Sequence, residues 1–181
     1  IAGYGQTIIP AASCEKADVQ SAVNLAQNDD IVTIPAGTCI WTTTLTIGTS
    51  ASLNKGIVLK GADCTMGTLT NGSLSKSGLP TACTTVIIDN VPSTNPNNLQ
   101  SVITAWTSPN FLTQITNIDF RAGTGTSGQA MIRLMNTSAL VRIDHNRFPS
   151  SRREIVTPGN PSCIFGVFDH NCAVRGKTSQ T

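Results

Sequence analysis

The stretch Arg142-Ile143-Asp144-His145-Asn146 recurs along the chain and decides the predicted fold. Asn117-Ile118-Asp119-Phe120-Arg121 precedes it and Phe168-Asp169-His170-Asn171 follows it, so the three aspartates are separated by two equal steps of 25 residues. Self-similarity at a period of about 20 to 50 residues is the signature of repeat architectures. The three copies therefore predict a repeating structure in which each repeat packs on the one before.

Short runs of β-branched and other apolar residues fill the rest of the repeats and predict strands. No further helical stripe separates these runs, so we expect their strands to stack in parallel. Longer loops are expected at residues 65–81 and 92–98. The fold class predicted for residues 1–181 is a single all-β domain, a right-handed parallel β-helix (solenoid). The predicted strands are Ile31–Ile34, Leu45–Ile47, Ile57–Leu59, Val86–Ile88, Val102–Ile103, Ile115–Ile118, Met131–Leu134, Val141–Ile143 and Ile164–Val167.

One segment, residues 17–28, has the pattern of a helix. Its apolar residues Val19, Ala22, Val23 and Ala26 lie on one stripe at helical spacing. Because the first repeat of a solenoid exposes its core, this helix is expected to be an N-terminal cap. Residues 173–181 show no comparable cap, so we expect an open C-terminal end that either continues into further repeats or associates with another subunit.

The composition limits the partners of the chain. It has 181 residues, 12% of them charged, and a net charge of +2. Without a basic block, neither a nucleic acid nor an anionic membrane is an expected partner. No run approaches the roughly 18 consecutive apolar residues of a membrane-spanning helix. The neutral surface, rich in Thr, Ser and Asn, is typical of secreted proteins.

Six cysteines without a Cys-x-x-Cys pair predict disulfides in an oxidising, extracellular compartment. Spacing favours pairing Cys14 with Cys39, Cys64 with Cys83 and Cys163 with Cys172. The alternative is that these are free, buried cysteines that pack as small hydrophobic residues. The motifs at Asn71 and Asn136 would accept N-linked glycans in a eukaryotic secretory route.

The chain resembles the pectate-lyase-like superfamily of right-handed parallel β-helices from Asp18 onward. Asp18–Val23 followed by Asp30–Thr38 is similar to the cap helix and first coil of secreted members. Val141–His145 is similar to the Trp-Ile-Asp-His motif of pectate lyases, with Arg142 where the family has Trp. The superfamily includes lyases, hydrolases, esterases, tailspikes and adhesins, so the resemblance implies a polysaccharide partner without choosing a reaction.

The repeated aspartates are the first candidate site. If they point outward, Asp119, Asp144 and Asp169 form a carboxylate ladder that could hold Ca²⁺ for a lyase. Such a reaction also needs a base to remove a proton next to a uronate carboxylate, and the candidates are Arg142 and Arg147. The alternative is that the aspartates only bond neighbouring turn amides.

The adjacent imidazoles and amides follow the same step. His145 and His170 are expected to lie one above the other, either as a general base or metal pair, or as a structural stack bonded to backbone. Asn146 and Asn171 fit a turn ladder, because Asn tolerates the left-handed conformation of a tight bend.

Further residues are candidates for substrate binding. Trp41 and Trp106 could stack on sugar rings, or could equally be core or loop anchors. Arg152 and Arg153, with Arg147, could bind uronate carboxylates, or could form a solvated loop.

Two functions remain open from the sequence. One is a secreted protein that acts on or binds extracellular polysaccharide, lyase-like if it is an enzyme. The other is a non-catalytic structural or adhesive protein, such as a fibre or filament subunit that self-associates through its open C-terminal end.

Overall fold

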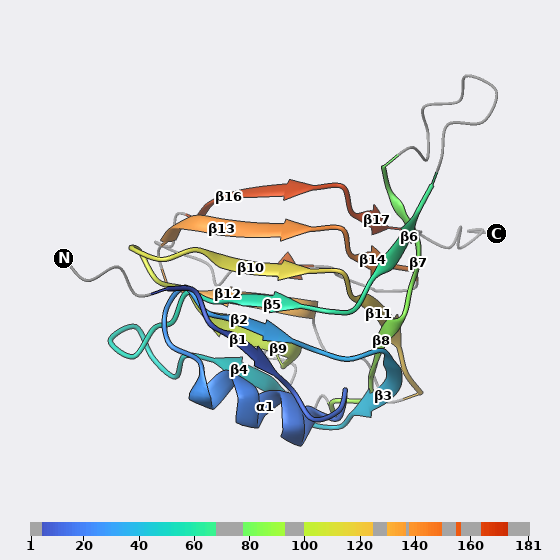
Figure 1. Ribbon diagram of the computed structural model, residues 1–181, viewed down its shortest axis with the longest axis horizontal. Coiled ribbons are helices and arrows are strands. Elements are labelled where there is room, and N and C mark those ends of the chain that lie inside the picture. The colour runs from blue at the N-terminus through green and yellow to red at the C-terminus, as the bar shows by residue number, and fades with distance from the viewer. Residues whose placement is uncertain are drawn as a thin grey trace, which may run out of the picture.

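A computed structural model describes residues 5–67, 78–92, 100–124, 130–136, 138–149, 155–156 and 164–173. The described part is mostly β, with one helix, α1 (Lys16–Leu25). Three parallel sheets hold most of the strands (Figure 1). Sheet A contains β1 (Ile8–Pro10), β2 (Ile31–Thr33), β5 (Val58–Lys60), β10 (Thr113–Thr116), β13 (Ser138–Asp144) and β16 (Ile164–Asp169).

Sheets B and C are built in the same parallel manner. Sheet B contains β3 (Gly37–Trp41), β8 (Thr85–Asp89), β11 (Asp119–Ala122), β14 (Arg147–Phe148) and β17 (Cys172–Ala173). Sheet C contains β4 (Leu45–Ile47), β9 (Ser101–Trp106), β12 (Ala130–Met135) and β15 (Ile155–Val156). An antiparallel hairpin of β6 (Cys64–Met66) and β7 (Pro80–Cys83) lies between β5 and β8 in the chain.

The prediction of a right-handed parallel β-helix is wrong. The strands lie in separate sheets that are not closed into one solenoid. A physical reason is visible where strands of sheet A end: the φ angles of 62° at Asn117 and 55° at His145 cannot continue an extended strand, so the hydrogen-bond ladder stops there. The predicted loop at residues 65–81 also contains the paired strands β6 and β7.

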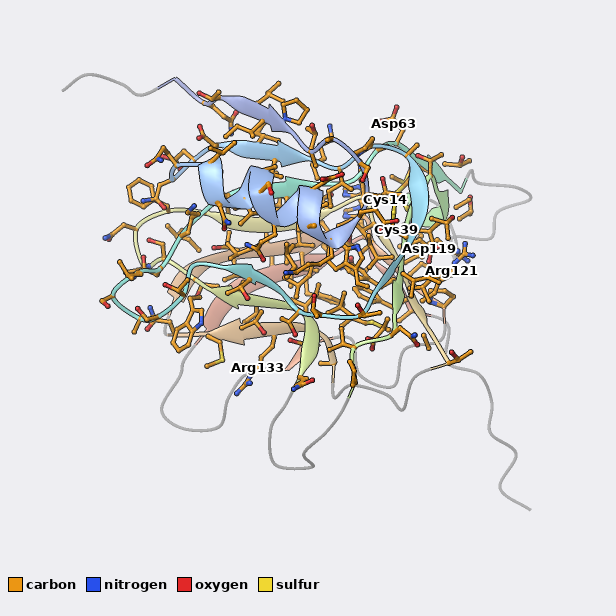
Figure 2. All side chains as sticks on the ribbon, turned by 90° about the horizontal axis from the view of Figure 1, so that it is seen from below. Cys14, Cys39, Asp63, Asp119, Arg121 and Arg133 are labelled. Carbon is orange, nitrogen blue, oxygen red and sulfur yellow. A yellow bond between two sulfur atoms is a disulfide. The ribbon has the colours of Figure 1, made fainter. Side chains whose placement is uncertain are left out.

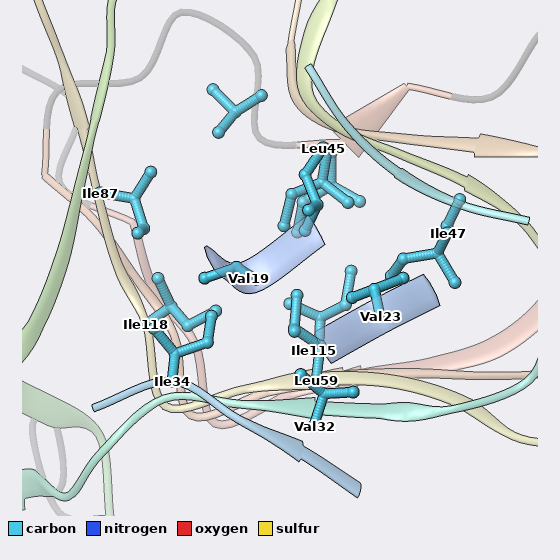
Figure 3. Packing of buried hydrophobic residues seen from close by; sticks show 14 of the residues in the cluster. Val19, Val23, Val32, Ile34, Leu45, Ile47, Leu59, Ile87, Ile115 and Ile118 are labelled. Atoms are coloured by element: carbon cyan, nitrogen blue, oxygen red, sulfur yellow. The ribbon is translucent and has the colours of Figure 1, made fainter. Parts of the chain in front are cut away.

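The inward side chains of the three sheets meet in one apolar core. In sheet A, neighbouring strands place Val32, Leu59, Ile115 and Ile143 in register, and each is buried. Sheets B and C contribute further buried residues, including Ile87 and Leu45 (Figure 3). Each strand is too short to bury much area alone, so the free energy of folding comes from stacking strand on strand.

Helix α1 covers the core at the end where the chain begins (Figure 1). It starts one residue earlier and ends three residues earlier than the predicted 17–28. Val19, Ala22, Val23 and Ala26 are all buried, which confirms the predicted stripe. The Lys55 ammonium donates to the carbonyl oxygens of Val23 and Ala26, at 2.8 and 2.7 Å, and so satisfies two acceptors near the C-terminal end of the helix.

Two disulfides join the pairs that the spacing predicts, Cys14 with Cys39 and Cys64 with Cys83. The first links the segment before α1 to β3, and the second cross-links the hairpin. Cys163 lies outside the described residues, and Cys172 has no disulfide partner among the described ones. The two bonds indicate an oxidising environment. In the part of the chain that the structure describes, no helix has the length and apolar character needed to span a bilayer.

Candidate functional site

The chain turns sharply where it leaves sheet A, and polar side chains gather at these corners. Thr116, Asp144 and Asp169 are the last residues of β10, β13 and β16, and they are paired in register. The residue after each has a left-handed backbone, with φ of 62° at Asn117, 55° at His145 and 50° at His170. Asn and His are among the side chains that tolerate this conformation best. The sequence prediction had placed the left-handed residues one position later.

Asn146 and Asn171 hold the corners through their amides. Asn146 is fully buried, and its Nδ2 donates to the carbonyl oxygens of Ile115 and Asp144, both at 2.9 Å. Its Oδ1 accepts from the N–H of Ile118 at 3.0 Å. Asn171 repeats the pattern one strand further on, and its Oδ1 accepts from the N–H of Asn146. These amides therefore form the structural ladder that the sequence predicts.

Each histidine is bonded to the aspartate before it. His145 Nδ1 lies 2.9 Å from Asp144 Oδ2, and His170 Nδ1 lies 3.0 Å from Asp169 Oδ2. The two rings are stacked, with centroids 5.1 Å apart and an interplanar angle of 6°. Because an ionised carboxylate only accepts hydrogen bonds, Nδ1 carries the proton in the neutral ring and Nε2 keeps its lone pair.

Asp144 is the centre of this cluster. Burial opposes its ionisation, but hydrogen bonds from Gln114 and His145 and the charge of Arg142 outweigh that effect and lower the pKa of Asp144. Gln114 Nε2 donates to Asp144 Oδ1 at 2.8 Å, and Arg142 Nε donates to Oδ2 at 3.1 Å. Arg142 also lies 3.5 Å from Asp169. The cluster thus contains two carboxylates, one guanidinium and two imidazoles.

The predicted three-carboxylate ladder is wrong. Asp144 and Asp169 are paired, but their partner in β10 is Thr116, while Asp119 lies in sheet B beside Arg147. The step is 28 residues from Thr116 to Asp144 and 25 from Asp144 to Asp169. The aspartates also do not all point outward, since the side chains of Asp119 and Asp144 are 0% and 4% exposed.

Asp119 forms a second, separate ion cluster. Arg121 and Arg147 each donate to its Oδ2 at 2.8 Å, and Figure 2 shows Asp119 beside Arg121. No group of three or more His, Cys, Asp or Glu side chains within the described ranges could hold a metal ion. A Ca²⁺ ion held jointly by Asp119, Asp144 and Asp169 does not fit this geometry.

The two arginines predicted as bases lie in different sheets. Arg142 is in sheet A with Asp144 and Asp169, and Arg147 is in sheet B with Asp119. Each guanidinium contacts carboxylate oxygens, which suits binding and positioning better than accepting a proton.

A shallow hollow of about 450 Å³ adjoins the Asp144–His145 pair on the outer face of sheet A. Lys60, Gln114, Thr116, Asn117 and His145 supply its polar lining. Lys60 is exposed and has no ion-pair partner within 4.0 Å among the described residues. The sequence analysis missed Lys60 and Gln114. Their outward positions, each next to an inward apolar residue of a short strand, were the available signal.

The predicted sugar-stacking tryptophans do not lie at this hollow. Trp41 is fully buried and its Nε1 donates to the carbonyl oxygen of Cys14 at 2.9 Å, so Trp41 is a core residue and not a sugar-binding surface. Trp106 is half-buried at the end of β9 in sheet C. Asn136 Nδ2, the atom that would carry a glycan, donates to the Thr107 carbonyl at 3.2 Å. Asn71, Arg152 and Arg153 lie outside the described residues.

Comparisons with known proteins give no assignment for this site. No family model matches the chain, and neither a curated protein nor a solved structure matches it significantly.

Proposed function

We propose that the protein binds an acidic polysaccharide outside the cell through the outer face of sheet A. The observation that carries the proposal is Lys60, an exposed ammonium without a carboxylate partner among the described residues, at a hollow lined by neutral hydrogen-bonding groups. An unpaired cation of this kind favours an anionic ligand. Gln114, Thr116 and Asn117 offer the amide and hydroxyl groups that hydrogen-bond to sugar hydroxyls.

Several further features support this choice. The disulfides support an extracellular setting, where acidic polysaccharides occur. The resemblance of Val141–His145 to the pectate-lyase motif supports a uronan as the ligand, because Asp144 and His145 border the hollow. The hollow is open rather than deep, which suits a chain that lies across the surface.

Binding is tested by titrating the protein with oligogalacturonate and oligoalginate, with a neutral glucan as the reference ligand. Lys60→Gln is expected to weaken binding about tenfold, which is the loss of one charge-assisted contact of about 1.4 kcal/mol. Lys16→Gln removes the same charge from the start of α1 and is the matched control. No binding of any uronan by the wild type, or equal weakening by both variants, would contradict the proposal.

Lyase activity stays a prediction that the same ligands test. Elimination leaves an unsaturated uronate that absorbs in the ultraviolet, so a rise in absorbance with and without Ca²⁺ would show turnover. A bound uronan that gives no such rise indicates a binding protein.

A structural or adhesive role is the second candidate, favoured by apolar side chains on the last strand of sheet A. Val167 and Phe168 are 51% and 52% exposed. Contact with a second copy of the chain would remove this surface from water. Sedimentation velocity at rising concentration is expected to show association that Val167→Thr and Phe168→Ser weaken, and a monomer at all concentrations would exclude this role.

A further inference from the structure

The chain has two histidines, and the fold brings both to one place. They come from different strands, 25 residues apart in sequence, yet their rings are stacked 5.1 Å apart at the corner of sheet A. Their side chains are 30% and 51% exposed, so solvent and solutes reach them. We propose that His145 and His170 together bind a late first-row divalent cation, such as Ni²⁺, Cu²⁺ or Zn²⁺, through their Nε2 atoms.

The carboxylates around the pair provide the first argument. A histidine that binds a metal almost always donates its other ring N–H to a carboxylate, a carbonyl or water, which fixes the tautomer and raises the basicity of the ligand nitrogen. Both rings have this arrangement, with Nδ1 bonded to Asp144 and to Asp169 at 2.9 and 3.0 Å. Both Nε2 lone pairs are therefore available to a cation.

The local charge provides the second argument. Asp144 and Asp169 contribute two negative charges and Arg142 one positive charge, so the immediate surroundings of the rings favour a cation. Lys60 lies across the hollow that His145 lines and is the nearest opposing charge that the hollow contains.

The geometry requires a small adjustment of the rings. Two nitrogen atoms on one ion lie at most about 4 Å apart, because each bond is about 2.0–2.1 Å long. The outer edges of the rings must therefore tilt toward each other from their stacked separation of 5.1 Å. Gly78 of the segment before β7 lies over His170, where a Cβ atom would be 4.0 Å from Nε2, so glycine leaves that ring edge open. Water completes the coordination shell.

The donor type predicts which ions bind. Imidazole nitrogen suits Ni²⁺, Cu²⁺ and Zn²⁺, whereas Ca²⁺ and Mg²⁺ prefer oxygen ligands. We expect affinity to rise from Mn²⁺ through Co²⁺ to Ni²⁺ and Cu²⁺, and we expect no binding of Ca²⁺ at this pair.

The test is calorimetric titration of the untagged protein with Ni²⁺ at a pH where neutral imidazole predominates. His145→Asn and His170→Asn are suitable variants, because Asn117 occupies the same left-handed corner on the neighbouring strand. Each is expected to weaken Ni²⁺ binding at least tenfold, while Asp169→Asn weakens it about 10- to 100-fold. Circular dichroism of each variant verifies that it remains folded.

A matched control separates the imidazoles from the thiol. Cys172→Ser removes a described cysteine without a disulfide partner and is expected to leave Ni²⁺ binding unchanged. The proposal is overturned if the wild type does not bind Ni²⁺, if one histidine variant binds as tightly as the wild type, or if Cys172→Ser abolishes binding. Each outcome is independent of polysaccharide binding.

Discussion

The two ends of the described structure are held together by different kinds of contact. At the helix end, formed by α1, β1, β2 and β3, buried apolar side chains such as Val23 and Trp41 dominate. At the ladder end, formed by β13, β14, β16 and β17, the buried amide of Asn146 and the carboxylate of Asp144 are fastened by hydrogen bonds to neighbouring strands. Apolar burial provides free energy without direction, whereas a satisfied polar network fixes register. The ladder end can therefore carry exposed, precisely oriented groups that the helix end cannot.

The largest effect is expected at the helix end. Trp41→Ala removes a fully buried aromatic side chain and leaves the Cys14 carbonyl without its donor, so the free energy of unfolding should fall by about 3–5 kcal/mol. Chemical denaturation measures this loss. Ile40→Ala changes the neighbouring side chain, which is 56% exposed, and should alter stability by no more than about 0.5 kcal/mol. Similar losses for both variants would contradict the core assignment.

A smaller loss is expected at the ladder end. Asn146→Ala leaves the buried N–H of Ile118 and the carbonyl of Ile115 without partners, at a cost of about 2–3 kcal/mol. Asn171→Ala removes the equivalent amide from a less buried position and should cost less. Faster hydrogen exchange at the Ile118 amide should accompany the first variant. Equal stability losses would show that burial does not strengthen this ladder.

The acid dependence of stability sharpens the comparison further. Because the pKa of Asp144 is lowered in the folded state, its ionised form contributes stability above the unfolded pKa of about 3.9, and this contribution is lost as the pH falls through the lower folded pKa. Asp144→Asn should therefore flatten the loss of stability between about pH 5 and pH 2. Thermal unfolding over that range measures it.

Asp30 provides the counterpart at the helix end. Backbone N–H donors of Gln27 and Thr7 lower its pKa in the same direction, so Asp30→Asn should flatten the same pH window. If the curves of either variant run parallel to that of the wild type, its carboxylate does not contribute in this way.

The smallest effect is expected at Asp89, midway between the two ends in sheet B. Burial raises the pKa of Asp89, so its ionised form is disfavoured in the folded state and acidification through that pKa relieves the penalty. Asp89→Asn keeps an acceptor for the Val91 N–H and should raise stability at pH 7 by up to about 1 kcal/mol. Asp63→Asn, at an exposed aspartate, is the control. A decrease in stability for Asp89→Asn would reverse the sign of this argument.

Local patterns in the sequence predicted much of the secondary structure. The nine β-branched and apolar runs all overlap strands, because alternating burial of such residues is a local property. Gly37–Trp41 was missed as a strand, since Gly, Thr and Cys hide the alternation that buries Cys39 and Trp41. Two-residue strands such as Arg147–Phe148 are too short to show any period.

The register of the candidate site could not be predicted from spacing alone. Ile118-Asp119 and Ile115-Thr116 both offer an apolar residue followed by a polar one, and the structure pairs Ile115 with Ile143. The discriminating feature is the left-handed corner, which Asn117 shares with His145. The mistaken equal step placed Asp119 in the ladder, and it concealed the hollow beside Lys60 because that hollow depends on strands far apart in sequence.

The hairpin of β6 and β7 marks a place where the molecule accepts extra length. The chain crosses from sheet A to sheet B through residues 117–118 and again through residues 145–146, but between β5 and β8 it uses residues 61–84. Thr38, Val86 and Asp119 nevertheless remain in register across sheet B. The Cys64–Cys83 bond closes the excursion at its base. A foreign epitope grafted into this connection would be displayed on a covalently closed arm, which makes the protein a scaffold for antigen presentation.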